Sequence, residues 1–70
     1  MNILIFKTNI RFKKDVEQLN PVLNGISTIA DWNVDREDID KVLRVVTTGD
    51  HSQAIISRVR QAGYWCEELV

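Results

Sequence analysis

The sequence predicts an α+β fold, in which a four-stranded antiparallel sheet carries two helices on one face. Three observations lead to this prediction. Apolar side chains recur with strand-like and helix-like periods in the order strand, helix, strand, strand, helix, strand. The two middle strands are joined by a short polar link, which is typical of a hairpin. A helix joins the first strand of the sequence to the hairpin, and a second helix joins the hairpin to the last strand. Right-handed crossovers place both helices on the same face.

The first half of the chain supplies one strand and one helix. Residues 2–7 are apolar on both faces and rich in β-branched side chains, as expected of a central strand. Residues 11–20 are predicted to form a helix with an apolar stripe made of Phe12, Val16, Leu19 and Leu23. Asn9 is the expected N-cap of this helix. Pro21 is expected to end or bend it, because proline has no backbone N–H to donate.

The middle of the chain is predicted to form the hairpin. Residues 27–35 alternate in polarity, with one face made of Thr28, Ala30, Trp32 and Val34 and the other of Ile29, Asp31, Asn33 and Asp35. Residues 36–40 are the polar link, and residues 41–47 are the next strand. In that strand Leu43 and Val45 share one face, while the other is made of Val42, Arg44 and Val46.

The last third of the chain is predicted to be a helix and a short strand. Asp50 and Gln53 have the spacing of a capping box, and Ser52 is an alternative N-cap. The core face of this helix is predicted to contain Ile55, Ile56, Val59 and Ala62. Gly63 stands where a left-handed residue ends a helix, and residues 64–67 form the final strand.

Size, charge and cysteine content exclude several classes of protein. Seventy residues predict a single domain over residues 1–70 with a small core. A net charge of −1 does not favour binding to nucleic acid or to an anionic membrane. Cys66 is the only cysteine, which is typical of a reducing cytoplasmic location, and no signal peptide or membrane span is expected. One histidine and one cysteine form no catalytic constellation, so we expect neither an enzyme nor a cofactor.

Three stretches of the chain resemble the heavy-metal-associated domain, the small module of copper chaperones and metal-transporting ATPases. They are the first strand running through a loop into the helix with Val16 and Leu19, the segment from Gly25 to Asp35, and Ala62-Gly63-Tyr64. The resemblance covers nearly all 70 residues and implies the ferredoxin-like βαββαβ sandwich. It also implies that the metal-binding Cys-x-x-Cys of that family falls on Asn9-Ile10-Arg11-Phe12. Neither Asn9 nor Phe12 supplies a thiolate, so the usual Cu(I) site is not expected here.

The loop before the first helix has two interpretations. A basic helix N-terminus is a candidate anion or small-ligand site, for which the candidates are Lys7, Thr8, Asn9, Arg11 and Lys13. The simpler interpretation is a solvated basic loop in which Asn9 caps the helix and Phe12 fills the core, since the glycines of a phosphate loop are missing.

Two further features are candidates for binding. Cys66 is expected to be a small buried residue, and the alternative is a thiol that binds metal or pairs across two chains. Exposed side chains on the uncovered sheet face are a candidate interaction surface made of Asp31, Asn33, Arg44 and Trp65.

The sequence therefore predicts a non-enzymatic binding or interaction module that lacks the metal site of the family it resembles. Its expected partner is a second copy of the chain or another protein, because a small core and a bare sheet face favour docking. Two alternatives remain open, namely a metal carrier with relocated ligands such as Cys66, and an anion sensor that uses the loop before the first helix.

Overall fold

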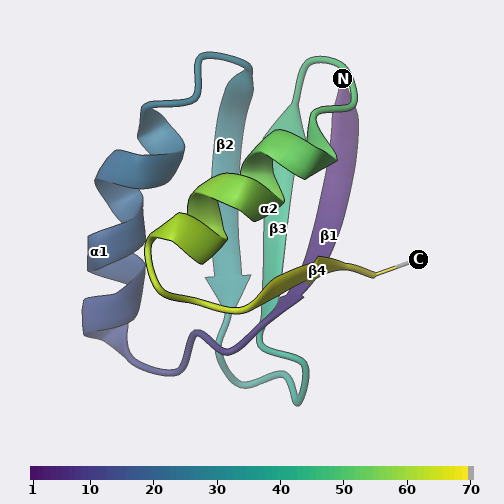
Figure 1. Cartoon of the computed structure of the whole chain (residues 1–70). Coiled ribbons are helices and arrows are strands. Elements are labelled where there is room, and N and C mark those ends of the chain that lie inside the picture. The colour runs from purple at the N-terminus through teal and green to yellow at the C-terminus, as the bar shows by residue number, and fades with distance from the viewer. Residues whose placement is uncertain (70) are drawn as a thin grey trace.

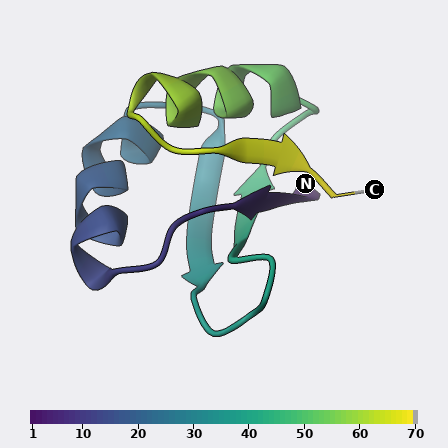
Figure 2. The same ribbon diagram turned by 60° about the horizontal axis from the view of Figure 1, so that its bottom comes forward.

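The computed structural model describes residues 1–69 and has the predicted order of elements (Figure 1). These are β1 (Asn2–Thr8), α1 (Lys13–Asn24), β2 (Ile29–Asp35), β3 (Val42–Thr47), α2 (Ser52–Gln61) and β4 (Cys66–Glu68). The strands form one antiparallel sheet in the order β2-β3-β1-β4. Both helices cover the same face of this sheet, as the turned view in Figure 2 shows, so the predicted ferredoxin-like sandwich is confirmed.

The position of β1 in the sheet explains why its sequence is apolar on both faces. β1 lies between β3 and β4, and Ile3, Ile5 and Lys7 pair with Val46, Arg44 and Glu67 on the face away from the helices. We call this uncovered side the open face. Leu4, Phe6 and Thr8 alternate with them and are buried beneath the helices.

The core lies between the sheet and the two helices. Its buried side chains are Leu4, Phe6, Ile10, Leu19, Leu23, Leu43, Val45, Ile55, Ile56, Val59 and Cys66. Leu43 and Val45 are among them, which confirms the alternation in residues 41–47, and so are Ile55, Ile56 and Val59 of the predicted stripe in α2. The prediction that Ala62 faces the core was wrong, because α2 ends at Gln61 and Ala62 is exposed. The core is small, as the length of the chain requires.

Helix α1 differs from its prediction at both ends. It begins at Lys13 and continues through Pro21 to Asn24, so the prediction that Pro21 ends the helix was wrong. Proline removes only one hydrogen bond, the one to the carbonyl four residues earlier, and the Pro21 ring lies on the exposed side. Burial of Leu19 and Leu23 on the other side holds the helix together across this gap.

The start of α1 does not use Asn9. Phe12 is the N-cap residue, and its backbone N–H donates to Oδ2 of Asp15 at 3.0 Å while the Asp15 N–H donates to the Phe12 carbonyl at 2.9 Å. The expectation that Phe12 fills the core was also wrong, because this side chain is 59% exposed. Its place in the core is taken by Ile10, which is fully buried.

Strand β2 contains an irregularity that changes which side chains face the helices. The register against β3 shifts between Ile29 and Asp31, as in a β-bulge. Ile29 therefore packs on the core together with Trp32 and Val34, whereas Ala30 is exposed. The predicted alternation is correct from Asp31 onward and wrong before it, since one extra residue reverses the phase of a strand.

The two ends of α2 combine one corrected and one confirmed prediction. The helix begins at Ser52 after His51, and the Asp50 carboxylate accepts from the Ser52 N–H at 3.4 Å, so the Asp50–Gln53 capping box was wrong. The left-handed residue after the helix is confirmed, because Gly63 has φ of +97°.

Candidate functional site

The loop between β1 and α1 is held in place by hydrogen bonds to distant parts of the chain. The Asn9 side chain accepts from the backbone N–H of Trp65 through Oδ1 at 2.9 Å. The Thr8 hydroxyl donates to the carbonyl of Lys41 and accepts from the N–H of Ile10 at 3.2 Å. The polar atoms of Thr8 and Asn9 thus fix the loop to the β2–β3 link and to the start of β4.

The five predicted anion-loop residues are not brought to one point. Lys7 lies on the open face opposite Glu67, and its Nζ is 3.8 Å from the Asp40 carboxylate. Thr8 is buried, Asn9 is bound to Trp65, and Arg11 and Lys13 are exposed near the start of α1. The Asp15 carboxylate already lies at that helix start, where a bound anion is otherwise favoured.

A polar cluster ties the start of α1 to the segment before β4. The Tyr64 hydroxyl lies 2.9 Å from Oδ1 of Asp15 and 2.7 Å from Oε1 of Gln18. Hydrogen bonding to the Phe12 N–H, with a further contribution from Tyr64, holds the pKa of Asp15 below its usual value. Burial, followed by the nearby Asp15 carboxylate, raises the pKa of Tyr64. Asp15 therefore stays ionised and serves as a structural acceptor.

Cys66 lies inside the core at the beginning of β4. Its side chain is fully buried opposite Thr8, which agrees with its predicted role as a small buried residue. Burial raises the pKa of the Cys66 thiol to about 11, and the nearby Arg60 only partly offsets this. The thiolate is the form that binds metal, so Cys66 is a poor ligand in the folded protein.

The residues present do not fit the thiolate site that the sequence resemblance implies. Asn9 offers an amide oxygen that is already bound to Trp65, and Phe12 offers a phenyl ring. Among residues 1–69, no cluster of three or more His, Cys, Asp or Glu side chains is arranged to hold a metal ion. Soft Cu(I) requires thiolate or thioether sulfur, which this loop does not provide.

The four predicted interaction residues divide between two places. Asp31, Asn33 and Arg44 share the open face, where Asn33 pairs directly with Arg44 across β2 and β3. Trp65 lies next to β4 at the opposite edge of the sheet from β2. It is 47% exposed, and the Arg60 guanidinium stacks over its ring at 4.6 Å from the centroid. Trp65 is therefore separate from the other three.

The open face also has apolar side chains that the sequence analysis did not select as a site. The exposed fraction is 63% for Ile3 and 36% for Ile5. Leu69 is also exposed, and it lies beside Ile5 because its backbone N–H donates to the Ile5 carbonyl. Val46 pairs with Ile3. We call Ile3, Ile5, Val46 and Leu69 the open-face patch. The sequence contained a signal for this patch. The first strand is apolar on both faces, whereas the helices of the predicted fold cover only one face of the sheet, so apolar side chains remain on the other.

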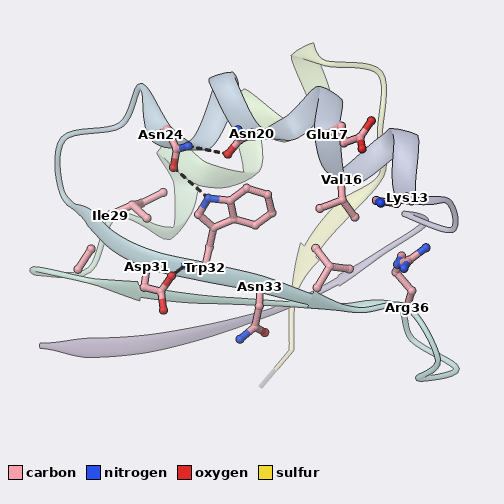
Figure 3. A pocket seen from close by; sticks show the side chains of 12 residues that line it. Lys13, Val16, Glu17, Asn20, Asn24, Ile29, Asp31, Trp32, Asn33 and Arg36 are labelled. Atoms are coloured by element: carbon pink, nitrogen blue, oxygen red, sulfur yellow. Dashed lines mark hydrogen bonds between the residues drawn. The ribbon is translucent and has the colours of Figure 1, made fainter.

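A groove lies between α1 and the outer edge of β2 and has a volume of about 640 Å³ (Figure 3). Its floor is apolar and contains Val16, Ile29, Trp32 and Val34. The Trp32 indole N–H donates to Oδ1 of Asn24 at 3.2 Å, and Asn24 in turn donates to Asn20 at 2.6 Å. Lys13 and Arg36 lie together at one end. The sequence did not predict this groove, because it depends on how α1 packs against β2.

Comparison with protein-family models and with curated proteins finds no match for this chain. Within residues 1–69, the helices are too short and too polar for any of them to cross a membrane. Similarity is found instead among solved structures, and there it extends over nearly the entire chain.

Three of these structures illustrate the likeness. The heavy-metal-associated domain of a copper chaperone for superoxide dismutase is 22% identical with a TM-score of 0.79, and covers 97% of this chain. This chain spans 66% of that protein. The yeast copper transporter domain Ccc2a is 12% identical with a TM-score of 0.84, covering 100% of this chain and 97% of its own. The N-terminal domain of PacS from Synechocystis PCC6803 is 14% identical with a TM-score of 0.82, covering 100% of both.

One similar structure is a complex between two proteins, Atx1 and Ccc2a, with Cu(I). It is 12% identical to this chain with a TM-score of 0.83, and covers 100% of this chain and 97% of its own. Identities this low establish architecture and nothing of activity. The chain therefore has the heavy-metal-associated fold that its sequence resembles, and it carries Asn9 and Phe12 at the two positions where that resemblance expects cysteines.

Proposed function

We propose that this domain is a non-enzymatic protein-interaction module that self-associates through its open face and works without the thiolate metal site. The observation that carries the proposal is the open-face patch. Ile3, Ile5 and Leu69 are exposed side by side on the only sheet face that the helices of residues 1–69 leave uncovered. Contiguous exposed aliphatic side chains with a polar rim are typical of docking surfaces.

The charges around the open-face patch support pairing of two copies. Arg44 lies near the middle of the sheet beside Ile5, whereas Asp31 and Asp35 lie on the edge strand β2. A two-fold contact in which the two sheets are displaced sideways would bring the acidic edge of one copy toward Arg44 of the other. The same acidic side chains disfavour stacking of nucleic acid on this face, because they repel phosphate.

Self-association is tested by measuring mass in solution against protein concentration. Light scattering is expected to show a rise from 8.1 kDa toward twice that mass as the concentration increases. Ile3→Asp should keep the protein monomeric, because it places a charge in the centre of the apolar contact. Arg44→Glu should also weaken the dimer. Ser57→Asp is the matched control, since Ser57 is exposed on α2.

A chain that stays at 8.1 kDa up to millimolar concentration would overturn the self-association proposal. So would a dimer that Ile3→Asp and Ser57→Asp weaken equally. Circular dichroism of each variant shows whether the fold is retained. Ile3→Lys is a second variant with the opposite charge, and it should act in the same direction as Ile3→Asp.

The metal part of the proposal is tested by titration under reducing conditions. We expect no tight stoichiometric uptake of Cu(I), because the loop has no thiolate and the Cys66 thiol is buried with its pKa raised to about 11. Cys66→Ser is the matched variant. Tight uptake by the parent that disappears in Cys66→Ser would replace this proposal with that of a carrier using relocated ligands.

Two finer parts of the proposal rest on the composition. The single histidine and the single, buried cysteine support a non-enzymatic role. The reduced thiol supports a cytoplasmic location, since disulfides predominate in small secreted domains.

A further inference from the structure

The outer edge of β2 lies directly beside the α1–β2 groove. Within residues 1–69, β2 pairs only with β3, so its other side faces the groove opening. Trp32 points from this strand into the groove and Val16 faces it from α1 (Figure 3). Val34 of the same strand also lines the groove. An unpaired strand edge next to an apolar slot has the two components that bind an extended peptide, namely backbone hydrogen bonds and pockets for alternate side chains.

The direction of the backbone groups of β2 follows from one hydrogen bond. The Trp32 N–H donates to Oδ1 of its neighbour Asp31 at 2.9 Å, and so it points away from β3. Groups in an antiparallel strand alternate between its two sides, so the N–H and carbonyl of Val34 also point outward. The backbone N–H and carbonyl groups of Asp31, Asn33 and Asp35 point to the other side, toward β3. The outer edge thus presents the N–H and carbonyl of Val34 and the carbonyl of Trp32 to an incoming strand, whereas the Trp32 N–H is already bound by Asp31.

The side chains of an added strand would meet two different environments. On the helix side they enter the groove above Trp32 and Val34, which is apolar. On the open-face side they lie beside Asp31 and Asp35, both of which are exposed. Opposite charges on neighbouring strands stabilise pairing. Lys13 and Arg36 at one end of the groove exclude basic side chains from the groove side.

We propose that the outer edge of β2 binds an extended peptide whose side chains alternate between apolar and basic, with the apolar ones in the α1–β2 groove. A second copy of this chain is a poor occupant. Pairing β2 with β2 in antiparallel fashion brings Asp31 of one copy opposite the acidic side of the other, and like charges there are destabilising. The proposed peptide surface is distinct from the open-face patch, and it therefore goes beyond the self-association proposed above.

The test uses the full chain and a nine-residue peptide of alternating lysine and valine, capped at both ends. Amide signals of residues 30–35 are expected to shift during the titration. Exchange of the Val34 amide hydrogen is expected to slow, because this N–H gains a partner. In a Trp65→Phe background, the fluorescence of Trp32 reports on the groove alone. Replacing every lysine of the peptide by glutamate should weaken binding by roughly tenfold or more.

Two protein variants separate the charge and backbone contributions. Asp31→Asn keeps an oxygen for the Trp32 N–H and removes the charge, so it should reduce the preference for lysine over glutamate. Asp50→Asn, which changes an exposed carboxylate elsewhere, is the matched control and should leave the preference unchanged. Val34→Pro removes the outward donor while sparing the pairing with β3, and it should weaken binding of the lysine peptide.

Three results would overturn the proposal. The first is an unchanged set of amide signals at residues 30–35 in the presence of millimolar peptide. Another is equal binding of a peptide with the same composition in which lysines and valines form separate blocks. The third is a set of shifts confined to residues 66–68, which would place the peptide on β4 at the opposite edge. Light scattering during the titration shows whether self-association contributes to any signal, so the failure of one proposal is distinguishable from the failure of the other.

Discussion

The loop before α1 contains three side chains with different structural roles, those of Asn9, Ile10 and Phe12. Asn9 binds the Trp65 N–H, Ile10 enters the core and Phe12 points to solvent. Each of these roles is structural, and none requires a ligand. The sequence correctly indicated that the loop lacks thiolates, because residue identity alone decides that. It did not indicate which of the two apolar residues is buried, since this depends on where the first turn of α1 begins.

Cys66 gives a prediction at the residue scale about alkaline pH. Its pKa rises from an ordinary 9.0 to about 11 on folding, so between these values the unfolded state loses the proton while the folded state keeps it. The free energy of unfolding should therefore fall as pH rises through this range, by on the order of 2 kcal/mol. Denaturant titrations at several pH values measure this decline.

Cys66→Ala is the control for that measurement, because it removes the titrating group. Between pH 9 and 11, the free energy of unfolding of Cys66→Ala should decline less than that of the parent, and the difference should be on the order of 2 kcal/mol. Equal declines in the two proteins would contradict the assignment. The parent thiol should also react slowly with a thiol reagent until denaturant exposes it.

Helices and strands with a long periodic pattern of apolar residues were predicted correctly. Features that depend on a single residue, such as a proline within a helix or a bulge in a strand, were not. The alternation in β3 correctly identified its buried apolar side chains, and the stripe in α2 was correct for Ile55, Ile56 and Val59 but wrong for Ala62 beyond the helix end. In α1, Pro21 argued for an early end, but burial of Leu19 and Leu23 outweighed one lost hydrogen bond. The bulge between Ile29 and Asp31 has no glycine or other signal in the sequence and reversed the faces before it.

Gly63 gives a prediction at the scale of the helix it ends. Its φ of +97° is unfavourable for a residue with a Cβ, although a Cβ there meets nothing within 4 Å. Gly63→Ala should therefore lower the free energy of unfolding by about 1 kcal/mol through the backbone alone. Gly63→Asn should cost less, because asparagine tolerates left-handed conformations better. Thermal unfolding of the three proteins measures the order, and equal losses for Ala and Asn would contradict the explanation.

At the scale of the whole molecule, the sheet order separates two candidate surfaces. The open-face patch centres on β1 and β3, whereas the proposed peptide-binding surface is the outer edge of β2 beside the α1–β2 groove. The sequence predicted three residues of the open face, namely Asp31, Asn33 and Arg44, because strand alternation places them. It grouped Trp65 with them, although the sheet order puts that residue at the far edge. Positions across a sheet follow from strand order, which a local pattern does not contain.

The separation of these surfaces predicts that their functions are independent. Ile3→Asp should abolish self-association and leave binding of the lysine–valine peptide unchanged within about twofold, because distant sites contribute additively. Val34→Pro should do the opposite. Measuring mass and peptide affinity for both single variants and the double variant checks this. A loss of both activities in either single variant that remains folded would indicate one shared surface.

The hydrogen bond between Asn9 and Trp65 has a consequence for attempts to engineer copper binding into this chain. Replacing Phe12 by cysteine changes an exposed side chain, whereas replacing Asn9 by cysteine also leaves the Trp65 N–H without its acceptor. An Asn9→Cys, Phe12→Cys double variant would thus gain thiolates while loosening the start of β4. Metal uptake by this double variant would be thermodynamically linked to the attachment of the last strand, and its affinity would report on how firmly that strand is held.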